Sequence, residues 1–135
     1  MLVKLLRIAN DQIGRLFAAC PRWAREFRDW YQRPSTNELR GRKLLKEWLS
    51  PEQLAQYDAL NCFEVTGCHT GKRYRISHGM GMNVYELDNA GRPRVGWCFV
   101  PNDHLVAGDV MLAQKIALET DERAVLAVAR NFTIR

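Results

Sequence analysis

The sequence predicts an α+β protein with N-terminal helices, a small antiparallel meander of three to four strands, and a closing C-terminal helix or helix pair. Two observations support this class. Apolar residues recur every three or four positions over residues 2–60 and again after residue 109, which is the period of a helix. From residue 63 the period changes to two, which is typical of strands. Because helices and strands occur in blocks, the arrangement expected is α+β.

The N-terminal third predicts a basic amphipathic helical arm over residues 1–34, followed by a compact α+β domain over residues 35–135. An apolar stripe from Leu2 to Cys20 has helical spacing, and a second short helix fits residues 22–32. Pro21 suits the boundary between them. The segment Arg33–Thr36 breaks the helical pattern and offers several N-cap residues, so we expect the boundary between arm and domain there.

Two further helices are expected before the strands. One runs from Asn37 to about Leu49, with four apolar side chains predicted to face inward, namely Leu44, Leu45, Trp48 and Leu49. The next begins at a capping box, in which Ser50 is the N-cap, Pro51 the first helical residue and Gln53 the third. It ends near Asn61, and its expected inward residues are Leu54, Tyr57 and Leu60.

The segment Phe63–Ser77 predicts a β-hairpin with a defined register. Pairing Val65 with Tyr74 places apolar residues opposite each other and sets Glu64 opposite Arg75, whereas a slip of one residue mixes the two patterns on one face. This register leaves residues 68–71 as a four-residue loop, in which glycine at position 71 can adopt a positive φ.

The remaining elements follow from turn signals and apolar runs. A third strand is expected within residues 82–88, a turn at residues 88–91, and a fourth strand from Arg94 onward with Pro93 at its beginning. Asp109 is expected to cap the final helix, which either continues or restarts at Thr120. Its second half would carry on one side Val125, Val128, Ala129 and Phe132.

Charge is distributed unevenly along a chain whose formal net charge is +5. Residues 1–46 carry 11 cationic and 4 acidic side chains, whereas residues 47–135 carry 9 and 11. This asymmetry indicates an anionic partner for the first third, with a solubilising basic surface as the alternative. Four cysteines without a CxxC pair or a secretory segment predict free thiols and a cytoplasmic protein. Lys4 and Arg7 interrupt the apolar N-terminus, so no membrane span is expected.

The histidines and cysteines predict neither a metal site nor a cofactor. His69 and His78 lie at opposite ends of one strand, roughly 30 Å apart, and zinc ligands usually come as close pairs. Cys68 and His69 look like a catalytic dyad, but adjacent loop residues usually point apart. With no nucleotide-binding or hydrolase motif in the sequence, we expect a non-catalytic protein, and a Cys-based enzyme using Cys68 or Cys98 is the less favoured hypothesis.

The favoured hypothesis is an accessory subunit of a nucleic-acid-associated complex, because cations neutralise phosphates. The expected nucleic-acid-binding residues are Arg22, Arg25, Arg28, Arg33, Arg40, Arg42, Lys43, Lys72, Arg73 and Arg75. The alternative is a protein–protein adaptor, or a self-associating module, that docks through residues 1–34. Its expected partner-binding residues are Trp23, Phe27, Trp30 and Tyr31.

Overall fold

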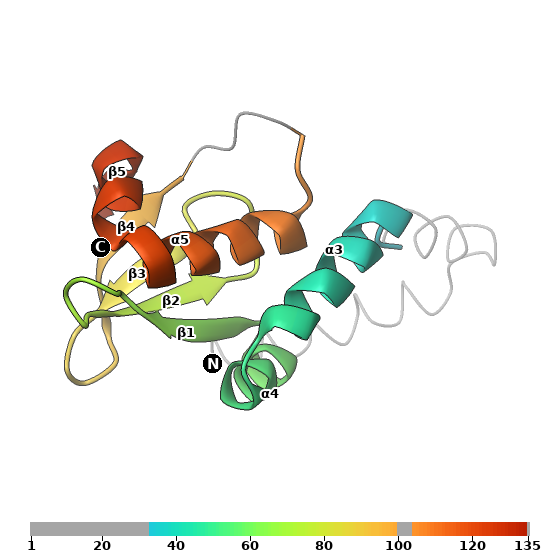
Figure 1. Ribbon diagram of the computed structural model, residues 1–135, viewed down its shortest axis with the longest axis horizontal. Coiled ribbons are helices and arrows are strands. Elements are labelled where there is room, and N and C mark those ends of the chain that lie inside the picture. Colours follow the sequence, from blue (N-terminus) through green and yellow to red (C-terminus); the bar gives the residue numbers. More distant parts are fainter. Residues whose placement is uncertain (1–32, 100–103, 135) are drawn as a thin grey trace, which may run out of the picture. The chain divides into compact units, whose positions relative to one another are not determined.

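The computed structural model describes residues 33–99 and 104–134 and confirms the α+β class (Figure 1). Its elements are α3 (Thr36–Trp48), α4 (Pro51–Leu60), β1 (Cys62–Thr66), β2 (Arg73–Ser77), β3 (Val84–Leu87), β4 (Pro93–Cys98), α5 (Ala107–Val128) and β5 (Arg130–Thr133). The two helices expected within residues 1–32 lie outside the described residues. So do seven of the predicted binding residues, namely Arg22, Trp23, Arg25, Phe27, Arg28, Trp30 and Tyr31.

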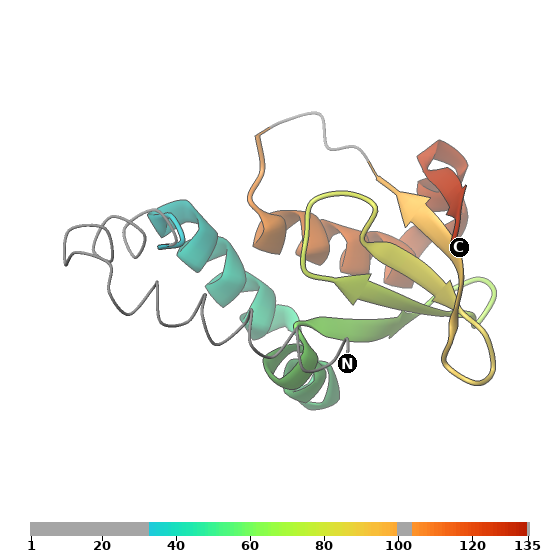
Figure 2. The same cartoon turned by 180° about the vertical axis from the view of Figure 1, so that it is seen from behind.

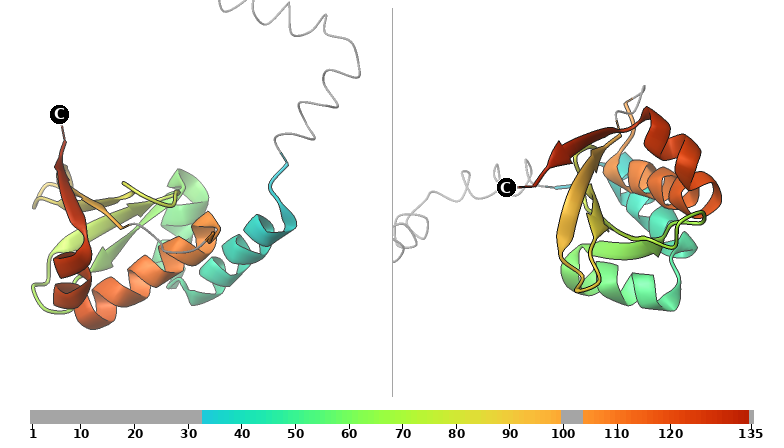
Figure 3. Two further views of the ribbon diagram at one scale, coloured as in Figure 1. Left: turned by 90° about the horizontal axis from the view of Figure 1, so that it is seen from above. Right: turned by 90° about the vertical axis from the view of Figure 1, so that its left-hand side faces the viewer.

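The strands form one antiparallel sheet in the order β1-β2-β3-β4-β5. Helix α5 lies against one face of this sheet and α3 packs on α5, as the front and back views show (Figures 1 and 2). The strands curve around one side of α5 (Figure 3). The core between the layers includes Leu45, Phe63, Tyr74, Ile76, Met111 and Leu118. A Cβ on Gly108 would overlap the backbone of Gly41, so the close approach of α5 to α3 requires this glycine.

Serine side chains begin both short helices. Ser35 Oγ accepts a hydrogen bond from Glu38 N at 3.1 Å at the start of α3. The capping box predicted for α4 is confirmed: Gln53 N donates to Ser50 Oγ at 3.2 Å, and Ser50 N donates to Gln53 Oε1 at 3.1 Å. Each bond satisfies an amide that the first helical turn leaves without a carbonyl partner.

Fewer apolar residues of α3 and α4 are buried than the sequence predicts. Leu45, Leu49 and Tyr57 are buried, as predicted. The prediction is wrong for Leu44, for Trp48, which is 59% exposed, and for Leu60, which is 71% exposed. The helices contact the rest of the domain along a single stripe, so apolar residues outside that stripe remain at the surface.

The hairpin has the predicted register. Val65 pairs with Tyr74 and Glu64 with Arg75, and Gly67 N donates to Lys72 O at 2.8 Å to close the loop. Gly71 has a φ of 70°, a conformation that costs glycine little. Pro93 begins β4, also as predicted.

The C-terminal segment differs from the prediction at its helix cap and at its end, where a fifth strand takes the sheet beyond the three to four strands predicted. The N-cap of α5 is Val106, so Asp109 lies in the first helical turn and does not cap the helix. The helix is kinked at Asp121, whose side chain accepts from Ala124 N at 3.3 Å, one residue after the predicted restart at Thr120. Phe132 lies on a fifth strand, β5, where its ring covers Gly96 of β4 and packs edge-on against Tyr85.

None of the helices within the described ranges combines the length and the apolar character needed to cross a bilayer.

Candidate functional site

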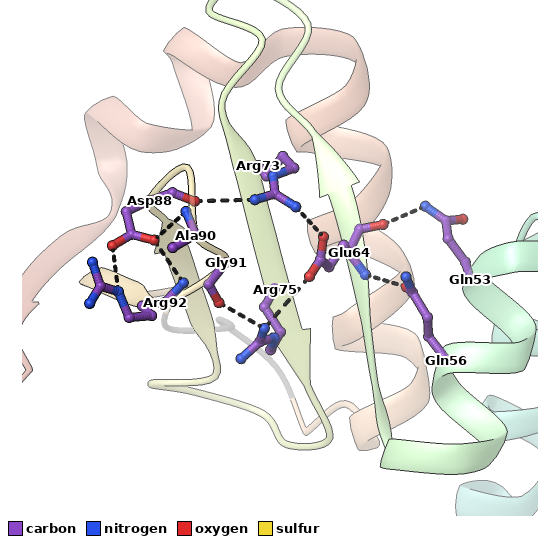
Figure 4. Close-up of polar contacts among 9 residues, drawn as sticks. All are labelled: Gln53, Gln56, Glu64, Arg73, Arg75, Asp88, Ala90, Gly91 and Arg92. Atoms are coloured by element: carbon purple, nitrogen blue, oxygen red, sulfur yellow. Dashed lines mark hydrogen bonds and ion pairs between the residues drawn. The ribbon is translucent and has the colours of Figure 1, made fainter.

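The predicted nucleic-acid-binding residues of the hairpin are engaged in ion pairs. Lys72 Nζ lies 3.0 Å from Glu86, and the carboxylate of Glu64 lies 3.4 Å from Arg73 and 3.6 Å from Arg75. Figure 4 shows this carboxylate between the two guanidinium groups. The pairing of Glu64 with Arg75 follows from the strand register, which sets them opposite each other.

The same arginines tie the hairpin to the turn between β3 and β4. Arg73 Nη2 donates to Asp88 O and Arg75 Nη2 donates to Gly91 O, both at 3.1 Å (Figure 4). Asp88 in turn accepts from the backbone amide of Arg92, and this bond, which outweighs the small effect of burial, lowers the pKa of the Asp88 carboxyl. The hairpin cations therefore hold two parts of the sheet together.

Two glutamines of α4 complete this network at the outer edge of β1. Gln53 Nε2 donates to Glu64 O, and Glu64 N donates to Gln56 Oε1, both at 2.9 Å (Figure 4). These side chains take the place of a further strand, because an edge residue otherwise leaves its amide and carbonyl unpaired. Gln53 thus serves both the capping box and the sheet edge.

Three of the four cations of α3 line a groove between α3 and α4. The groove has a volume of about 620 Å³ and is lined by Leu39, Arg42, Lys43, Lys46, Glu47, Tyr57, Asp58 and Asn61. Arg42 and Lys43 were predicted as binding residues, and the structure brings them together with Lys46. Sequence analysis missed Lys46, although it follows Arg42 by four residues and therefore shares its helix face. Arg40 lies outside this groove, beside Leu44 and His104, and Arg33 is exposed ahead of α3.

Arg42 is held in place from the β2 side of the groove. Its Nη2 lies 3.3 Å from His78 Nε2, and His78 Nδ1 lies 3.1 Å from the hydroxyl of Tyr57. Arg42 Nε is buried and has no hydrogen-bond partner among the described residues. Burial raises the pKa of the Tyr57 hydroxyl, against the opposing effect of Arg42, so the phenol is neutral at physiological pH.

Two of the three groove cations have no carboxylate partner within the described part of the chain. Lys46 Nζ pairs with Asp58 at 2.7 Å, whereas no ion pair joins Arg42 or Lys43 to a carboxylate of the described residues. The Lys46–Asp58 pair is about half exposed and is therefore screened by solvent. Arg42 and Lys43 give the groove its positive character, in contrast to the hairpin cations.

A second polar cluster lies beneath the hairpin loop. Cys68 Sγ lies 3.5 Å from His69 Nδ1, so the expectation that these neighbours point apart is wrong. Both contact the kink of α5, where Glu122 N donates to Cys68 Sγ at 3.4 Å and Arg123 N donates to His69 Nδ1 at 3.3 Å. The kink makes these two amides available, and the side chains of Cys68 and His69 both accept hydrogen bonds from them, which explains why these two side chains meet.

Glu122 is fully buried at the centre of this cluster, and its carboxylate accepts four hydrogen bonds. The donors are His69 N at 2.8 Å, Thr70 N at 2.9 Å, the Thr70 hydroxyl, and the Tyr74 hydroxyl at 2.7 Å. Burial alone would raise the pKa of Glu122, but the four bonds outweigh it and hold the pKa at about 2. Burial and the adjacent carboxylate raise the pKa of Tyr74.

The atoms of Cys68, His69 and Glu122 lie within 4.8 Å of one another, close enough to be considered as metal ligands. However, the four donors use the lone pairs of both Glu122 oxygens, so a metal ion would have to displace them. His69 Nδ1 already accepts a backbone amide, and taking a proton from Cys68 would break that bond. The arrangement is that of a clamp between loop and helix. Glu122 was not predicted from the sequence because its donors lie 48 to 53 residues away.

No protein-family model, curated protein or solved structure shows significant similarity to this chain.

Proposed function

We propose that this protein is a non-catalytic binding protein whose basic groove between α3 and α4 engages the phosphates of a nucleic acid. The observation that carries the proposal is the convergence of Arg42, Lys43 and Lys46 on one groove. Two of these cations lack a carboxylate partner among the described residues, so a phosphate can neutralise them without breaking an internal ion pair. The donors of Asn61 and Tyr57 in the same lining add neutral hydrogen bonds.

The hairpin contributes little to this proposal. Lys72, Arg73 and Arg75 each have a carboxylate within ion-pair distance, so binding a phosphate there would compete with Glu86 or Glu64. The proposed interface therefore centres on the groove residues of α3.

The test is binding of a fluorescent double-stranded DNA oligonucleotide, measured by fluorescence anisotropy over a range of salt concentrations. A Lys43→Glu variant should bind more weakly, and the slope of log K against log salt should become shallower by about 0.9 if one phosphate contact is lost. Arg123→Glu makes the same charge change on α5, outside the groove, and should retain the slope of the wild type. Equal losses in the two variants, or binding that does not depend on salt, would contradict the groove as the binding surface.

A protein partner is the second candidate, and one observation favours it. Large apolar side chains are exposed on the same two helices, namely Leu39, Trp48 and Leu60. Exposed apolar side chains of this size are enriched where proteins associate. If the chain self-associates through them, light scattering should show a concentration-dependent mass that falls in a Trp48→Ser, Leu60→Ser double variant. A strict monomer at every concentration would remove self-association.

A further inference from the structure

His78 connects the two helices that form the basic groove. Its ring lies between Arg42 of α3 and Tyr57 of α4, both of which line the groove, and its backbone amide donates to Asn61 O at 3.0 Å. Its side chain is 18% exposed. Any change in the charge of this ring therefore acts directly on groove residues.

The hydrogen bonds determine which nitrogen of the neutral His78 ring carries the hydrogen. An arginine side chain only donates, so the bond from Arg42 Nη2 requires His78 Nε2 to accept and places the ring hydrogen on Nδ1. Nδ1 then donates to the Tyr57 oxygen, which leaves the phenolic hydrogen free for another acceptor. The neutral ring thus restrains the guanidinium of Arg42 and orients the hydroxyl of Tyr57.

Protonation of His78 abolishes its hydrogen bond with Arg42. A protonated Nε2 can no longer accept from Arg42, and two cations would face each other across 3.3 Å. Glu38 of α3 lies 3.9 Å from the same nitrogen and can pair with the imidazolium. On the Tyr57 side, among the described residues, Lys46 lies 5.9 Å from the centre of the Tyr57 ring and pairs with Asp58. The expected response is that Arg42 moves away from His78 while Glu38 replaces it.

We propose that His78 is a pH-dependent positioning residue, whose protonation releases Arg42 into the groove and strengthens the binding of phosphate groups there. The inference rests on the proposed function of the groove. Protonation adds one positive charge beside the groove and frees the Nη2 donor of Arg42 for a ligand, so both effects act in the same direction. Burial and the charge of Arg42 lower the pKa of His78 from its usual value, against the opposing effect of Glu38.

Oligonucleotide binding at about pH 7.5 and about pH 5 tests the proposal, and the lower value allows for the lowered pKa of His78. Wild-type protein should bind several-fold more tightly in acid, and its salt slope should steepen by about 0.9, equivalent to one more neutralised phosphate. A His78→Gln variant, whose amide oxygen can still accept from Arg42 but does not titrate, should lose this additional slope. His104→Gln removes an exposed histidine outside the groove lining and should respond to pH as the wild type does.

An NMR titration without ligand tests the coupling separately. The side-chain resonances of Arg42 should shift with the same midpoint as the His78 ring, and Arg42→Gln should raise that midpoint because Arg42 lowers it. Circular dichroism checks that each variant is folded.

The outcomes separate the two proposals. If wild-type protein binds and His78→Gln retains the full pH response, the role of His78 is overturned and the proposed function stands. If the Arg42 resonances do not follow the His78 titration, the proposed release of Arg42 is overturned, whether or not an oligonucleotide binds. If no oligonucleotide binds at either pH, the proposed function fails, and regulation of that binding fails with it.

Discussion

A Glu122→Gln substitution removes the charge of a buried carboxylate while keeping the size of the side chain. In the wild type both oxygens accept two hydrogen bonds each, from the backbone and side chains of the hairpin. The glutamine oxygen can still accept, but its amide group would point hydrogens at two donors. The clamp between the hairpin loop and the kink of α5 should therefore weaken.

The size of the effect follows from the pKa of Glu122. The folded protein lowers this pKa from 4.5 to about 2. At 1.36 kcal/mol for each unit, the folded state stabilises the ionised carboxylate over the protonated one by about 3 kcal/mol. Because the folded pKa is depressed, this stabilisation is complete above pH 4.5 and is lost as the pH falls through about 2. Glutamine does not titrate, so it lacks this dependence.

Urea unfolding, monitored by circular dichroism at several pH values, measures the loss of stability and its dependence on pH. At neutral pH the free energy of unfolding of Glu122→Gln should be lower than that of the wild type by about 3 kcal/mol, and the difference should shrink as the pH approaches 2. Glu119→Gln is the control on the same helix: its carboxylate is 33% exposed and pairs with Lys115, and the glutamine oxygen can still accept from Lys115 Nζ, so its loss should be smaller than that of Glu122→Gln. Equal losses in the two variants, or a difference that stays constant with pH, would refute the assigned role of Glu122.

Two further substitutions test packing and the sheet edge. A Cβ on Gly67 would overlap the carboxyl group of Glu122, whose four bonds prevent it from moving aside, so Gly67→Ala should cost about 2 kcal/mol or more in thermal unfolding; an unchanged melting temperature would contradict this. Gln53→Glu keeps an acceptor for Ser50 N, but it cannot donate to Glu64 O and it sets a second carboxylate against Glu119, so it should cost about 1 kcal/mol or more. Gln53→Ala loses the contacts with Ser50 N, Glu64 O and Glu119 together. If Gln53→Glu is as stable as the wild type, the bond from Gln53 to the sheet edge contributes nothing.

The sequence predicts the elements whose cause is local. The register of β1 and β2 follows from side chains within fifteen residues, because only one pairing places Val65 opposite Tyr74 and Glu64 opposite Arg75. The capping box of α4 depends on Ser50 and a glutamine three residues later. In both cases the interacting groups are neighbours in the chain, so the interaction can be predicted from a local sequence pattern.

The elements that were missed depend on distant residues. Phe132 continues the helical spacing of Val125 and Val128, and only the space above Gly96, on a strand 36 positions earlier, makes a strand position favourable. Glu122 is a charged residue on a predicted helix, where a solvated position is the ordinary expectation. Its burial depends on donors from the hairpin loop, which no spacing around position 122 reveals.

The structure also decides which cations can test binding. Lys43 lines the groove and has no carboxylate partner among the described residues, so reversing its charge changes the groove and breaks no described ion pair. Arg73 pairs with Glu64 and donates to the turn that begins at Asp88, so reversing its charge would place two carboxylates side by side and loosen the sheet. A loss of binding in an Arg73→Glu variant would therefore follow from altered folding as readily as from a lost phosphate contact. The two substitutions carry the same change in net charge, and only the one on α3 separates recognition from stability.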